Sequence, residues 1–68
     1  MIYLTVYKSG GKHYSTRYLN KGDADFILKR PGTTEIFTLS GENIRQINDN
    51  ARAEAKKRGI TEVINLME

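Results

Sequence analysis

The chain has 68 residues, with eleven Lys or Arg, eight Asp or Glu and no cysteine. A chain of this length forms a single domain, residues 1–68, and buries only about 60% of the surface that it exposes when unfolded. The lack of cysteine excludes disulfides and thiolate metal sites, so close packing or a second subunit has to stabilise the fold. It also fits a reducing cytoplasm, where we expect the protein to be located.

No apolar run approaches the roughly 18 residues that span a bilayer, so we expect no membrane partner. The net charge of +3 is unevenly distributed. Residues 1–34 carry six basic and two acidic side chains, whereas residues 35–68 carry five basic and six acidic ones. A basic first half is compatible with nucleic acid or an acidic protein surface as partner, or simply with a soluble basic surface.

The first two predicted elements form a hairpin. Residues 2–7 and 13–19 alternate between apolar and polar side chains, with the period of two that is typical of strands. Gly10-Gly11 lies between them, and paired glycines favour a tight turn that needs positive φ.

The register of this hairpin decides which tyrosines face outward. A two-residue turn puts Tyr7 opposite Tyr14 and Tyr3 opposite Tyr18, with all four tyrosines on one face. A three-residue turn that includes Ser9 instead moves Tyr14 and Tyr18 into the core beside Val6 and Ile2. We expect the three-residue turn because it gives the more apolar inner face.

The middle of the chain predicts two more strands. Residues 24–29 contain Phe26-Ile27-Leu28 and favour a strand over a single helical turn capped by Asp23. A turn at residues 30–33 precedes another strand at residues 35–39.

One helix follows, with Ser40 expected as its N-cap and Glu42 in its first turn. Its apolar positions are Ile44, Ile47, Ala51 and Ala55, and its polar side includes Arg45, Asn48, Arg52 and Lys56. That side either contacts phosphates or is a solvated surface. Gly59 ends the helix, and residues 60–67 predict a final strand. The expected fold is α+β: a four-to-five-stranded, largely antiparallel sheet in the order ββββαβ with one amphipathic helix on one face.

The hairpin with Gly10-Gly11-Lys12, followed by strands and a helix, resembles the small arm-binding domains of phage integrases, although a strand after the helix departs from that pattern. The hairpin also holds the most distinctive residues of the chain, in which aromatic and basic side chains are interleaved. These residues either pack a small sheet or form a contact patch. The predicted partner-binding residues are Tyr3, Tyr7, Lys8, Lys12, His13 and Arg17.

The sequence shows no catalytic, cofactor-binding or metal-binding motif. His13 is the single histidine, so a catalytic triad would need partners from distant segments. Residues 20–31 resemble the start of a calcium loop but have Asp25 and Pro31 where that loop needs glycine and glutamate. We therefore expect neither an enzyme nor a cofactor.

Three hypotheses follow. The first is a small protein that binds nucleic acid or a nucleoprotein complex, for example a phage or mobile-element accessory regulator or an inhibitor of a host defence complex. The second is a protein–protein module that forms a homodimer. The third is a weak ribonuclease-type toxin that uses His13 with Lys12 and Arg17.

Overall fold

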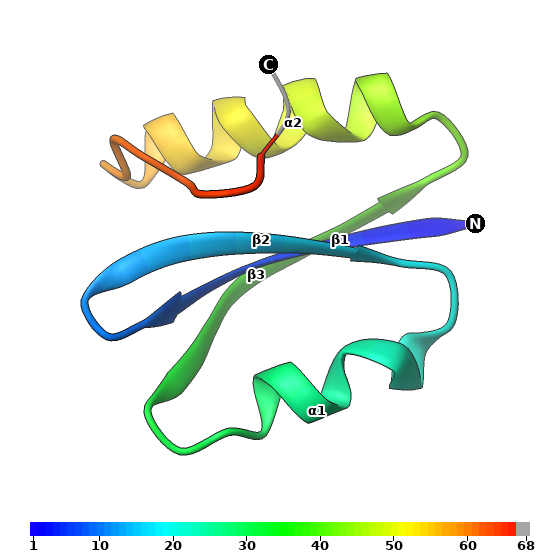
Figure 1. Ribbon diagram of the computed structural model, residues 1–68. Helices are drawn as coiled ribbons and strands as arrows, with labels where there is room; N and C mark the ends of the chain where they lie inside the picture. Colours follow the sequence, from blue (N-terminus) through cyan, green and yellow to red (C-terminus); the bar gives the residue numbers. More distant parts are fainter. Residues whose placement is uncertain (67–68) are drawn as a thin grey trace.

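A three-stranded antiparallel sheet, in the order β2-β1-β3, lies between two helical segments (Figure 1). The structure is a computed structural model that describes residues 1–66, except the side chain of Lys21. Its strands are β1 (Ile2–Ser9), β2 (Lys12–Tyr18) and β3 (Thr33–Gly41). The helical elements are the 3-10 helix η1 (Lys21–Ala24), the single turn α1 (Asp25–Leu28) and the main helix α2 (Ile44–Lys57).

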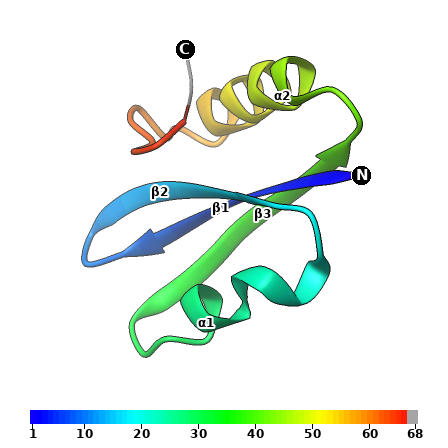
Figure 2. The same cartoon turned by 45° about the vertical axis from the view of Figure 1, so that its right-hand side comes forward.

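The two helical segments lie on opposite faces of the sheet. The views in Figures 1 and 2 both place α2 on one side and the η1–α1 segment on the other. η1 contacts β2 and α1 contacts β3, so this segment spans the face as it joins the two edge strands. The protein is therefore α+β as predicted, with one main helix. The expected sheet of four to five strands in the order ββββαβ is wrong.

The predicted strand at residues 24–29 is helical instead. β2 and β3 both run antiparallel to β1, so the chain has to return along the sheet before β3 can begin. The η1–α1 segment makes this return, and Ala24 within it is only 2% exposed. Asp23 does not cap α1, because Ala24 is the N-cap residue and no side chain accepts a hydrogen bond there.

The predicted final strand is reduced to one bridge. Ile64 pairs in parallel with Tyr14, and residues 60–63 before it are irregular. Asn65 has φ 70, a left-handed conformation that turns the backbone away from the straight path of a strand. Met67, the last residue of the predicted strand, lies outside the described residues.

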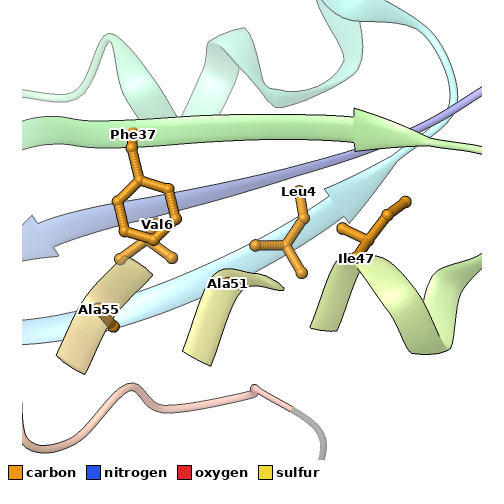
Figure 3. Packing of buried hydrophobic residues seen from close by; sticks show 6 residues of the cluster. All are labelled: Leu4, Val6, Phe37, Ile47, Ala51 and Ala55. Atoms are coloured by element: carbon orange, nitrogen blue, oxygen red, sulfur yellow. The ribbon is translucent and has the colours of Figure 1, made fainter. Parts of the chain in front are cut away.

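The core lies between α2 and the facing side of the sheet. Leu4 and Val6 of β1 and Phe37 of β3 contact three residues of α2 (Figure 3): Ile47, Ala51 and Ala55. The predicted apolar stripe is therefore the buried side of α2. Asn48, which was predicted on the polar side, is buried with 5% exposure.

Both ends of α2 have clear hydrogen-bonded caps. Asn43, and not Ser40, is the N-cap; its Oδ1 accepts from the backbone N–H of Arg45 and Gln46 at 3.0 and 3.2 Å. Ser40 belongs to β3, and Glu42 precedes the helix. At the other end Gly59 has φ 80, and the N–H of Ile60 donates to Ala55 at 2.9 Å. This pattern is a Schellman motif, and it confirms the predicted helix end.

No helix in residues 1–66 is both long and apolar enough to cross a membrane.

The N-cap assignment can be tested by substitution. Asn43→Ala removes the acceptor of two backbone N–H groups and should lower the free energy of unfolding by about 1 kcal/mol. Asn50→Ala is the matched control, because Asn50 is an exposed residue within α2 and alanine favours a helix interior. Urea unfolding followed by circular dichroism measures both. Equal stability of the two variants would contradict the assignment.

Candidate functional site

The hairpin has the two-residue turn, so the preferred three-residue register is wrong. Gly10 and Gly11 have φ 59 and 81, and Tyr7 lies opposite Tyr14. Positive φ at both central residues matches the right-handed twist of the flanking strands, which favours this turn. The three-residue register gives one apolar face, but here a helical segment also lies on part of the second face.

The four tyrosines share the face opposite α2, which we call the tyrosine face. Tyr3 and Tyr18 stack with ring centroids 5.4 Å apart, and Tyr7 and Tyr14 stack at 5.6 Å. Thr5, fully buried between these pairs, shares hydrogen bonds with the Tyr18 hydroxyl at 2.7 Å and the Thr38 hydroxyl at 2.8 Å. The tyrosines are half-buried, so they pack the sheet and still present part of each ring to solvent.

The six predicted partner-binding residues divide between the two faces of the sheet. Side chains alternate along each strand, and the register places Tyr3, Tyr7 and Lys12 on the tyrosine face. It places Lys8, His13 and Arg17 on the face that packs against α2. The structure therefore does not gather the six side chains into one continuous surface.

The η1–α1 segment covers only part of the tyrosine face. In both views the turn between β1 and β2 projects beyond α1 (Figures 1 and 2). The Tyr7–Tyr14 pair lies toward this turn, whereas the Tyr3–Tyr18 pair lies toward η1. The ring pair near the turn is thus the one farther from η1.

A second basic group lies close to the turn. A hollow of about 400 Å³ is lined by Lys12 and His13 from the hairpin and by residues 59–62 that follow α2. Lys56, Lys57 and Arg58 immediately precede this segment and are exposed. We define the hairpin end as residues 8–13 together with residues 56–58. Sequence reasoning missed this cluster because it counted charge by halves of the chain.

Acidic side chains offset part of this charge. Arg58 Nε donates to Glu54 at 3.1 Å, and its guanidinium lies 5.1 Å from the centre of the Phe37 ring. Glu62 also lines the hollow. Arg58 therefore helps to close one end of the core, while Lys8, Lys12, Lys56 and Lys57 present exposed charge.

The predicted polar side of α2 does not form a continuous basic row. Arg45 and Lys56 are exposed, but Asn48 is buried between them in sequence. Its Oδ1 accepts no hydrogen bond from the described residues. A phosphate backbone could not contact all four predicted residues at once.

The three residues of the ribonuclease hypothesis do not meet at one point, although Lys12 and His13 line the same hollow. Lys12 points to the tyrosine face, and His13 points to the other. Arg17 lies four residues beyond His13 along β2, which corresponds to about 13 Å. Within residues 1–66 no group of three His, Asp or Glu side chains could hold a metal ion.

Comparison of the chain with protein-family models, with curated proteins and with solved structures finds no match.

A double-mutant cycle tests the register. Thr5→Val and Tyr18→Phe each remove one hydroxyl of the 2.7 Å hydrogen bond. Their effects on unfolding free energy should be non-additive, with a coupling of about 0.5–1.5 kcal/mol measured by urea unfolding. Thr5→Val with Tyr14→Phe is the control cycle, because Tyr14 stacks on Tyr7; it should be additive. Additive effects in the first cycle would contradict the observed register.

Proposed function

We propose that the protein binds nucleic acid, free or within a nucleoprotein complex, through the hairpin end. The supporting observation is that lysines from two distant segments, residues 8–12 and 56–57, lie at the same end of the molecule. Each segment alone carries two exposed lysines. Together they place several exposed ammonium groups where a phosphate backbone could contact more than one of them.

The chemistry of these residues suits contacts with phosphates. Lysine carries a compact charge on a flexible stem, so it can follow a backbone without a fixed geometry. Contacts of this kind position a nucleic acid and carry little sequence information. The proposal is therefore for binding with weak sequence preference.

The nearby ring pair adds a surface for bases. Tyr7 and Tyr14 are half-buried and stacked, and Lys12 lies two residues before Tyr14 on the same face. An unpaired base that stacks on an aromatic ring contributes about 1–3 kcal/mol in single-strand binders. This favours single strands or exposed loops as the ligand.

The proposed binding site differs from the set of partner-binding residues predicted from the sequence. Tyr7, Lys8, Lys12 and His13 remain, and Tyr14, Lys56 and Lys57 join them. Tyr3 and Arg17 lie toward the other end of the strands. We further propose that the protein acts in the cytoplasm. We also propose that it binds without catalysing a reaction, because phosphate and stacking contacts need no reactive group.

The charge contribution can be measured with single-stranded oligonucleotides. Affinity should fall steeply as salt rises. In the variant Lys8→Ala/Lys12→Ala, the slope of log K against log salt should decrease by about 0.7 per lysine that contacts a phosphate. Fluorescence anisotropy over a salt series at constant pH gives both values.

Arg17→Ala/Arg45→Ala provides the matched control, because it removes the same charge at the other end of the strands, where Arg17 and the start of α2 line a separate hollow. Its salt slope should stay close to that of the unmodified protein. If both double variants lose affinity equally, general charge and not the hairpin end controls binding. If no oligonucleotide binds even at low salt, the proposal fails.

A further inference from the structure

The two edges of the sheet differ. On the outer side of β2, the N–H of Ser15 donates to Ile64 at 2.9 Å, and the N–H of Ile64 donates to the carbonyl of His13 at 2.9 Å. β3 pairs with β1 on one side, and within residues 1–66 no strand pairs with its other side. β3 is nine residues long, so it is a long open edge.

The register identifies the backbone groups that point out from β3. The backbone groups of His13 and Ser15 point away from β1. The backbone groups of the alternate residues of β2 therefore bond to β1. Those alternate residues of β2 pair with the odd-numbered residues of β1. The even-numbered residues of β1 therefore bond to β3. On β3, their partners Leu39 and Gly41 therefore direct their backbone groups toward β1. Thr38 and Ser40, both exposed, direct their N–H and C=O groups outward.

The composition of this edge leaves it unprotected. Residues 37–41 contain no charge and no proline, which are the usual means of blocking pairing between edge strands. The charge within β3 is Glu35, on the far side of the irregularity between Val6 and Tyr7 of the β1–β3 pairing. The second half of β3 can therefore accept another strand.

A second copy of the chain fits this edge. An antiparallel pair related by a two-fold axis at Leu39 places Thr38 of each chain opposite Ser40 of the other. Both pairs are then hydrogen-bonded pairs, and the two Leu39 residues meet in a close non-hydrogen-bonded pair, with Cα atoms about 4.5 Å apart. Leu39 is half-buried and packs against the core, so the two thin cores become continuous through it.

The hairpin lysines lie away from this interface, although the Arg58 guanidinium contacts Phe37, two residues from the axis. Each chain carries +3, and like charges oppose association. Pairing through β3 keeps β2 at the two outer edges, so Lys12 of each chain lies far from the two-fold axis. Antiparallel pairing also points the two hairpin ends in opposite directions.

We propose that the protein forms a homodimer through β3, with a six-stranded sheet in the order β2-β1-β3-β3-β1-β2. This inference does not depend on nucleic-acid binding, and either proposal can fail without the other.

Ser40→Pro tests the interface. Proline removes the outward N–H of Ser40 but leaves the inward bonds of β3 to β1, and edge strands accept proline at such positions. Ser40→Ala is the matched control, because it keeps the N–H. Sedimentation equilibrium from micromolar to millimolar concentration should show a dimer of the 7.8 kDa chain for the unmodified protein and for Ser40→Ala. The dissociation constant of Ser40→Pro should be at least about tenfold higher, which corresponds to the loss of about 1.4 kcal/mol.

Amide hydrogen exchange of the unmodified protein gives an independent measurement, which holds even if Ser40→Pro does not fold. Exchange at Thr38 and Ser40 should slow as protein concentration rises, while exchange at Gln46, an exposed position at the start of α2, should not change. A monomer at millimolar concentration, or exchange at Thr38 and Ser40 that is independent of concentration, overturns the dimer.

Discussion

The turn at Gly10-Gly11 determines which side chains meet across the sheet. Positive φ at both glycines makes a two-residue turn, and the alternation of side chains then fixes the face of every residue in β1 and β2. Leu4 and Val6 face α2 and become the fully buried centre of the core. The tyrosines face the other way and stack in two cross-strand pairs. A turn one residue longer would place Tyr14 and Tyr18 beneath α2.

The η1–α1 segment makes this register favourable. A small sheet with one covered face would be most stable with its apolar side chains all on that face, and this reasoning favoured the wrong turn. Ala24 is nearly inaccessible, and the Tyr18 hydroxyl bonds to the buried Thr5. The tyrosine face therefore excludes water around Thr5. Ser15 can lie on the α2 side because its backbone N–H and hydroxyl reach the carbonyl of Ile64.

Local patterns predicted the elements whose signals lie within a few residues. The alternation of β1, the stripe of Ile47, Ala51 and Ala55, and the glycine at the end of α2 are all found. The failures come from competition between local and long-range interactions. Ser40 and Asn43 are both good N-cap residues, and pairing with β1 extends β3 through Ser40, which leaves Asn43 to start the helix. The proximity of Lys12 to residues 59–62 depends on the packing of α2, so no pattern in the sequence predicts it.

The bridge at Ile64 links the stability of the fold to the candidate site. Its two hydrogen bonds attach the segment after α2 to β2 at His13 and Ser15, directly beside the turn. The same attachment holds residues 59–62, which follow the lysines of α2, beside Lys12 and His13. Like charges repel, so lysines gathered at one end of the molecule oppose folding unless an anion lies near them. The backbone bonds of the bridge and the aromatic contact of Arg58 with Phe37 oppose this repulsion. A bound phosphate backbone would relieve it, and binding would then also stabilise the thin core.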